Sequence, residues 1–299
     1  MNRETLKWCG LSEVVTPLWT MAEDIQGYAA AGFGAIGLFI HKFEKPQFVG
    51  FWIPGETIPG DRVAAAADAI KKAGLTVSHM AVVGFYTEPD REARIAHTLH
   101  AMDVAAALDC EALIIAPGRR NGRSYQEARD FAARALTEVF ERASQPQVRL
   151  ALEPIIPWQS DYMNTLGEAL ELADLVDHPN LGVYVDSFHL WRTGTLLEDI
   201  ERAGPRIFGV HLNDAVEEDT SHNRLAGEGE LPLQDIVRAV EATGYTGTYD
   251  CEYMYDPSLI ESDPERFAPE VVVQRCARAM ADVLDGVIDV SRREGALAK

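Results

Sequence analysis

The sequence predicts a (β/α)8 TIM barrel that forms a single domain over residues 1–299. Two observations lead to this prediction. Short apolar segments alternate with segments of helical character along the whole chain, which is the pattern of a parallel sheet wrapped by crossover helices. Four successive strand-like segments in the second half also close on a side chain that can bind a metal, and TIM barrels carry their active sites at the carboxyl ends of their strands.

The expected elements follow from apolar runs and from the spacing of apolar residues. We expect strands near residues 6–10, 35–40, 75–80, 112–116, 148–154, 181–186, 207–214 and 247–253. We expect helices near residues 21–31, 61–73, 89–108, 125–143, 166–176, 196–203, 233–243 and 269–293. The longest irregular segments are 41–60, 211–232 and 256–268, and no linker divides the chain. A doubly wound open sheet is less favoured, because no G-x-G-x-x-G segment or P-loop follows the first strand.

The helix ends have recognisable signals. A Ser or Thr followed three residues later by Glu can cap two free backbone amides at a helix start. Four pairs fit this pattern: Thr20 and Glu23, Ser124 and Glu127, Thr165 and Glu168, and Thr195 and Glu198. Glycine is the residue that adopts a left-handed conformation at a helix end most readily, and Gly32, Gly74 and Gly244 follow three of the expected helices.

Composition argues against several classes of function. An apolar content of 47% and a charged content of 25% are typical of a globular protein with a large core. The net charge of −20 opposes binding to nucleic acid and to anionic membranes, because both require Lys and Arg to neutralise phosphates. The N-terminal segment has no apolar signal region, and no run approaches the roughly 18 to 20 apolar residues that span a bilayer. We therefore expect a cytoplasmic protein; a homo-oligomer is compatible with the sequence, which does not fix the oligomeric state.

Four expected strands place metal-binding residue types at one end of the sheet. Glu153, Asp186, His211 and Glu252 close the strands near 148–154, 181–186, 207–214 and 247–253. Side chains alternate along a strand, and this alternation puts apolar residues such as Val183 and Val185 on the face opposite Asp186. Each acid taken alone could be an exposed loop residue, but four such residues at corresponding strand ends favour a common site.

Three carboxylates that meet in a partly dry site repel one another unless they share protons or bind a cation. A divalent cation is the simpler solution. Ligation by several oxygens and one imidazole suits Mn²⁺, Mg²⁺ or Co²⁺ with open coordination positions better than closed, tetrahedral Zn²⁺.

The second half of the chain resembles a known family. The motifs that carry the resemblance are Glu-Pro at Glu153, D-x-x-H at Asp186 and His189, H-x-N-D at His211 to Asp214, R-x-x-G-x-G at Arg224 to Gly229, and the late Glu252. This set resembles the xylose isomerase-like TIM-barrel superfamily, and within it the sugar phosphate isomerase/epimerase family with its ketose 3-epimerases. The first half contributes only the alternation of strands and helices.

The resemblance implies a metal-dependent reaction on a sugar. Glu153, Asp186, His211 and Glu252 would hold one divalent metal, with Mn²⁺ the first expectation, which chelates neighbouring oxygens of a keto- or hydroxy-sugar. Glu153 and Glu252, on opposite sides of the substrate, would remove and return a proton through a metal-stabilised enediolate. His189 and Arg224 correspond to residues that bind substrate hydroxyls in the epimerases. A second-shell histidine and a solvated loop arginine are the alternatives for these two residues.

Two departures from the family pattern affect the choice of substrate and reaction. The ketose epimerases carry another acid six residues after the first glutamate, where this chain has Gln159, so the sugar is left open. The AP endonuclease branch shares the D-x-x-H and H-x-N-D motifs but needs further histidines for three zinc ions. Ala116 stands at the end of the fourth strand, where that branch places a metal ligand. His222 lies one position away from the place that the later D-x-H motif of that branch would give it. Together with the negative charge, these differences argue against DNA cleavage.

Other residues near the expected strand ends could contact a substrate. Trp158 belongs to a group of tryptophans that could form an apolar wall against a sugar ring or an aglycone, together with Trp19, Trp52 and Trp191. His79 is expected to end the third strand and His41 to follow the second, and both could touch substrate at the rim. Buried loop anchors and satisfied rim histidines have the same sequence signature.

The sequence thus favours an isomerase or epimerase of a small ketose, keto-sugar or polyol ketone. A lyase that uses the same metal and glutamates to expel a β-leaving group is the nearest alternative. A non-catalytic sugar- or metal-binding barrel is the alternative of a different class.

Overall fold

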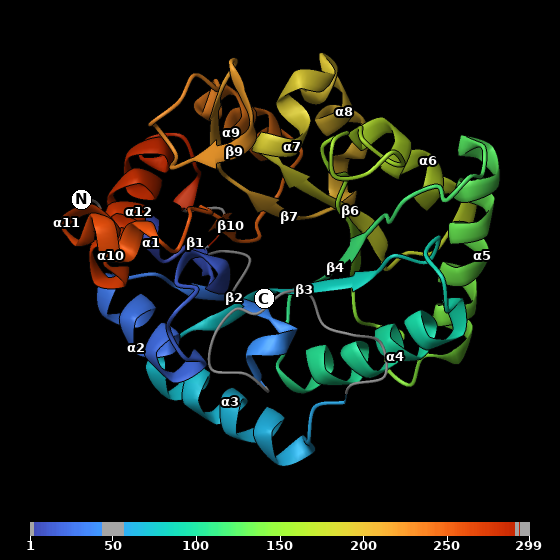
Figure 1. Ribbon diagram of the computed structural model, residues 1–299, viewed down its shortest axis with the longest axis horizontal. Coiled ribbons are helices and arrows are strands. Elements are labelled where there is room, and N and C mark those ends of the chain that lie inside the picture. Colours follow the sequence, from blue (N-terminus) through green and yellow to red (C-terminus); the bar gives the residue numbers. More distant parts are fainter. Residues whose placement is uncertain (1–2, 44–56, 291–292, 294–299) are drawn as a thin grey trace.

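The computed structural model describes residues 3–43, 57–290 and 293, and within them eight parallel strands close a barrel. Figure 1 shows these strands at the centre with helices arranged around them. The order around the barrel is β1-β10-β7-β6-β5-β4-β3-β2. The strands are β1 Cys9–Ser12, β2 Ala35–Phe39, β3 Thr76–Gly84, β4 Ala112–Ala116, β5 Leu150–Leu152, β6 Leu181–Asp186, β7 Ile207–His211 and β10 Tyr249–Cys251.

The main helices of the outer layer lie where the sequence predicts them. They are α2 Met21–Ala31, α3 Gly60–Ala73, α4 Arg91–Ala107, α5 Tyr125–Arg142, α6 Leu166–Val176, α8 Leu196–Ala203, α9 Leu233–Ala242 and α12 Pro269–Leu284. Helix α12 ends earlier than the expected residue 293, and Gly286 follows it in the left-handed conformation with φ of 70°. No helix in the described part of the chain is long and apolar enough to cross a membrane.

Three of the four expected helix caps are confirmed. Thr20, Ser124 and Thr165 each accept a hydrogen bond from the amide of the glutamate three residues on, and that glutamate binds the cap amide in return. The fourth cap is wrong, because Thr195 has φ of −120° and ψ of 8° rather than the extended conformation that a cap needs. Its hydroxyl donates instead to Asp199 Oδ2 over 2.8 Å. Gly32, Gly74 and Gly244 have φ of 98°, 77° and 87°, as expected.

The largest differences from the sequence expectations lie near the strand ends. The first strand was expected at 6–10, but Arg3–Leu6 forms a short helix, α1, and β1 begins at Cys9. The expected strand 207–214 ends at His211, and the segment 211–232 contains an antiparallel hairpin of β8 Asp214–Val216 and β9 Asp219–Arg224. The segment 256–268 contains two short helices, α10 Leu259–Ser262 and α11 Pro264–Phe267. Most of segment 41–60, including Trp52, lies outside the described residues.

Candidate metal centre and active-site cavity

Four neighbouring strands bring the expected ligands together at one end of the barrel. Asp186 and His211 are the last residues of β6 and β7 and are paired in register, while Glu153 and Glu252 directly follow β5 and β10. One possible ligand atom from each of these residues lies within 4.8 Å of the others. The predicted set therefore forms one cluster, and strand order explains it, because β5, β6, β7 and β10 are adjacent around the barrel.

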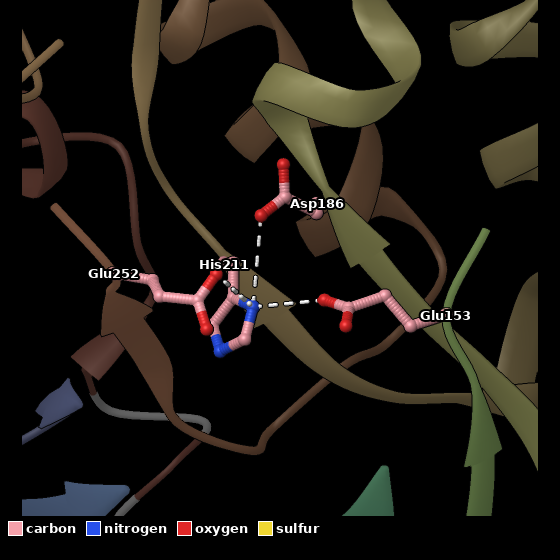
Figure 2. A group of neighbouring side chains, drawn as sticks. All are labelled: Glu153, Asp186, His211 and Glu252. Carbon is pink, nitrogen blue, oxygen red and sulfur yellow. Dashed lines mark hydrogen bonds and ion pairs between the residues drawn. The ribbon is translucent and has the colours of Figure 1, made fainter. Parts of the chain in front are cut away.

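The imidazole of His211 lies at the centre of this cluster. Its Nδ1 atom is 2.9 Å from Glu153 Oε1, 3.4 Å from Glu252 Oε2 and 3.6 Å from Asp186 Oδ2. Figure 2 shows Glu252 and Glu153 on opposite sides of His211, with Asp186 on a third side. The side chain of His211 is fully buried, and those of Glu153 and Glu252 are 10% and 12% exposed. Three carboxylates thus face one nitrogen at the base of an almost dry site.

The electrostatics of the cluster fit a cation. Burial raises the pKa of the Glu252 carboxyl well above its usual range, and the nearby Glu153 and Asp186 raise it further. Burial alone lowers the pKa of His211, but Glu252, Asp186 and Glu153 outweigh this effect and raise that pKa well above its usual range. Without a metal, the cluster therefore holds protons that a divalent cation would displace. The converging oxygen and nitrogen donors match the chemistry of such an ion.

Asn213 connects two of the acids. Its Nδ2 donates to Asp186 Oδ2 over 3.1 Å, and its Oδ1 accepts a hydrogen bond of 3.1 Å from the backbone amide of Glu252. The Asn213 backbone is itself fixed by Ser187, whose hydroxyl donates to Asn213 O over 2.6 Å and accepts from Asn213 N over 2.8 Å. The sequence identified Asn213 only as part of the H-x-N-D motif, because this link between two strand ends exists only in the folded barrel.

A polar network lies beneath the cluster inside the barrel. Asp250 Oδ1 accepts from Ser78 over 2.6 Å, and its Oδ2 accepts from the Tyr184 hydroxyl over 3.0 Å. The Tyr184 hydroxyl also lies 3.2 Å from His79 Nδ1. The ring centroids of His79 and Tyr184 are 4.8 Å and 4.5 Å from that of His211, so this network supports the central imidazole from below.

The expected rim position of His79 is wrong. Strand β3 continues to Gly84, so His79 lies within the strand, is fully buried and is absent from the described lining of the cavity. Burial lowers the pKa of its imidazole, with Asp250 acting in the opposite direction. His79 is therefore placed to position Asp250, Tyr184 and His211 rather than to contact a substrate.

A cavity of about 710 Å³ opens above this cluster. Glu153, Asp186 and Glu252 contribute to its lining, and so do His189 and Trp158, two of the expected substrate-binding residues. The His189 amide donates to Asp186 Oδ1 over 2.8 Å, and among the described residues its buried Nδ1 has no hydrogen-bond partner. Trp19, Trp191 and His41 are not among the described lining residues.

The chain is similar to known proteins in sequence and in fold. Residues 25–275 match the sequence model of the xylose isomerase-like TIM barrel family. The chain belongs to this family.

Relatives within the family include sugar isomerases and epimerases. The chain is 28% identical to the inosose isomerase of Halalkalibacterium halodurans over 173 residues, which are 55% of this chain and 60% of that protein. It is 30% identical to the D-psicose 3-epimerase of Enterocloster bolteae over 124 residues, which are 41% of this chain and 39% of that protein. The matches thus span less than two thirds of either relative.

A solved structure of the IOLI protein with a bound zinc atom has the same fold. Its TM-score with this chain is 0.78 at 18% sequence identity, and the superposition covers 94% of this chain and 99% of that one. At 18% sequence identity, this similarity shows a shared fold.

Arg224 lies in the β8–β9 hairpin and not at the cavity wall where a substrate-binding role was expected. Its guanidinium donates to Asp219 Oδ2 over 2.8 Å, within the hairpin, and the described cavity lining does not include it. The neighbouring Ser221, His222 and Asn223 do line the cavity and were not expected to. The segment Asp219–Arg224 is polar throughout, so it lacks the alternation that would have identified it as a strand.

The glycines of the R-x-x-G-x-G motif pack around Asp214. The carboxylate of Asp214 accepts hydrogen bonds from the amides of Ala215, Gly227 and Leu231, over 2.8, 3.0 and 2.9 Å. A Cβ atom at Gly229 would lie 2.3 Å from Asp214 Oδ1, so only glycine fits there. The motif therefore holds the hairpin and its following loop against the end of β7.

Proposed function

We propose that this protein is a divalent-metal-dependent isomerase or epimerase of a keto-sugar. The observation that carries the proposal is the buried cluster in which Glu153 and Glu252 lie on opposite sides of His211, with Asp186 completing the donor set (Figure 2). The isomerase and epimerase activities named for the relatives support the same class of reaction.

The four residues of the cluster would hold the cation. We expect Mn²⁺, with Mg²⁺ or Co²⁺ as alternatives, from the predominance of oxygen donors. When bound, the cation supplies Lewis-acid polarisation of a carbonyl and stabilises negative charge that develops on its oxygen. Asn213 keeps Asp186 and the backbone of Glu252 in place around it.

The two glutamates would move the proton. One carboxylate removes the hydrogen from the carbon next to the carbonyl, and the electron pair of the C–H bond moves into the carbonyl to give an enediolate. The other glutamate, which carries a proton at this stage, returns it to the opposite face of the same carbon and so inverts its configuration. If the remaining hydroxyl proton first moves to the other enediolate oxygen, return of the carbon proton to the former carbonyl carbon would complete an isomerisation instead. His189, at the cavity wall, would bind a hydroxyl of the substrate.

The test follows proton exchange. Protein stripped with a chelator and reloaded with Mn²⁺, Mg²⁺, Co²⁺ or Zn²⁺ is incubated in D₂O with a panel of ketoses, inososes and 3-keto-sugars. We expect deuterium at the carbon next to the carbonyl, and none with the metal-free protein. Loss of water or of an aglycone, seen by mass spectrometry, would identify a lyase instead. Absence of exchange with every keto-sugar and every metal would overturn the proposal.

A further inference from the structure

The cavity above the proposed metal centre carries exposed apolar side chains. Among the described residues, five large apolar side chains are exposed, and two of them, Trp158 and Met254, line this cavity, each 50% exposed. The other three, Leu18, Leu175 and Leu197, are absent from its described lining. Exposed apolar side chains that gather at a concave site mark a surface that is covered when a ligand binds.

These two side chains follow the two glutamates along the chain. Trp158 lies in the loop that Glu153 begins, and Met254 lies two residues after Glu252. A molecule held at both glutamates therefore meets both apolar residues as it extends away from the metal centre. The backbone at Met254 is fixed in this position, because Asn223 Oδ1 accepts from the Met254 amide over 3.0 Å and Asn223 Nδ2 donates to Glu252 O over 2.9 Å.

Further apolar side chains line the same cavity. The side chains that line it include Val82, Phe85, Ile155, Phe188 and Tyr255. Polar residues such as Arg119 and Gln159 also line the cavity, but sugar hydroxyls placed against these apolar side chains would lose hydrogen bonds to water without direct replacement. The volume of about 710 Å³ also lies well inside the range of about 300 to 1,000 Å³ typical of sites that bury drug-sized ligands, which exceed a single monosaccharide in size.

We propose that the substrate is a keto-sugar that carries an apolar substituent of aryl size. This inference rests on the proposed function and names its substrate class. The carbonyl end binds at Glu153, Asp186, His211 and Glu252, and the substituent packs against Trp158 and Met254. An indole ring and a thioether both interact favourably with an aromatic group.

The experiment compares matched pairs of substrates. Each keto-sugar of the exchange panel is paired with its O-benzyl ether or phenyl glycoside, substituted away from the carbonyl, and with the corresponding methyl derivative. We expect kcat/KM for deuterium exchange to be at least about tenfold higher for the aryl derivative than for the parent sugar, from the apolar area that it buries. The methyl derivative should lie near the parent.

Variants of the two exposed cavity residues test where the aryl substituent binds. Trp158→Ala and Met254→Ala should each reduce the preference for the aryl derivative several-fold. Leu197→Ala, which removes an exposed apolar side chain away from the cavity, should leave the preference unchanged.

The outcomes separate the two proposals. Equal kcat/KM values for parent, methyl and aryl substrates, with exchange intact, would overturn the apolar subsite and leave the isomerase or epimerase function standing. A preference for the aryl derivative that survives both cavity variants would also overturn the placement of the substituent. If none of the substrates in these pairs shows exchange, the proposed function is overturned, and the substrate class with it.

Discussion

The side-chain amide of Asn213 donates a hydrogen bond of 3.1 Å to Asp186 Oδ2, while its oxygen accepts the backbone amide of Glu252. One side chain thus fixes the ends of β6 and β10 relative to each other. Because β7 lies between these strands in the barrel, Asn213 also determines how the two acids face His211.

Replacement of Asn213 by Ala should weaken metal binding. Loss of an outer hydrogen bond to a ligating carboxylate typically lowers metal affinity about 10- to 100-fold. Isothermal titration calorimetry with Mn²⁺ measures this change. Asn180→Ala is the control, because the Asn180 side-chain amide donates to Pro146 O over 2.9 Å just before the start of β6, at the end of the strand opposite to Asp186. Equal affinities for the two variants would show that Asn213 does not organise the site.

Replacement of Glu252 by Gln should separate catalysis from stability. Turnover should fall at least about 100-fold, the lower end of what general acid–base groups contribute. The metal-free variant should unfold at a temperature no lower than the wild type, because burial raises the pKa of Glu252 and makes its ionised form unfavourable. Glu218→Gln, an exposed substitution, is the control. Full activity in Glu252→Gln would remove this residue from the mechanism.

A buried ion pair between Lys42 and Asp24 should be essential for stability. Lys42 Nζ lies 2.6 Å from Asp24 Oδ2, and both side chains are fully buried. Lys42→Met leaves the charge of Asp24 uncompensated and should lower the free energy of unfolding by about 3 to 5 kcal/mol. The exposed pair Lys72 and Asp68 provides the control, since Lys72→Met should cost less than about 1 kcal/mol.

Urea denaturation measures both Lys variants. Addition of Asp24→Asn to Lys42→Met should recover part of the lost stability, because it removes the unpaired carboxylate. Similar losses for Lys42→Met and Lys72→Met would contradict this account of the buried pair.

Glu111, at the opposite end of the barrel, should make stability depend on pH. Burial raises the pKa of its carboxyl to about 7, although Thr248 donates to Oε1 over 2.9 Å and acts in the opposite direction. A carboxyl whose pKa is raised on folding stabilises the protein fully below its unfolded pKa of about 4.3 and loses this contribution as pH rises through the folded value.

Stability should therefore fall between pH 4.5 and pH 8. The side chain keeps some solvent contact, so the loss attributable to Glu111 should be on the order of 2 kcal/mol. Chemical denaturation of wild type and Glu111→Gln over this range measures it, and the variant should gain stability relative to the wild type as pH rises. Parallel pH profiles would mean that Glu111 titrates normally.

The sequence by itself predicted the barrel, most of its helices and the clustering of Glu153, Asp186, His211 and Glu252. Strand alternation is a local rule, and the carboxyl ends of parallel barrel strands lie at one end of the barrel, so Glu153, Asp186, His211 and Glu252 are expected to meet once their strands are adjacent. The capping boxes at Thr20, Ser124 and Thr165 are equally local, since both partners lie within four residues.

Only the tertiary structure decided how deeply the other candidate site residues are buried and which residues they contact. His79 proved to be buried because β3 extends past it to Gly84, and Arg224 is held by Asp219 in a hairpin whose polar sequence lacks an apolar alternation. The link from Asn213 to Asp186 and the apolar mouth at Trp158 and Met254 join residues far apart in the chain. Such contacts depend on where several strands end relative to one another, and no local pattern encodes that.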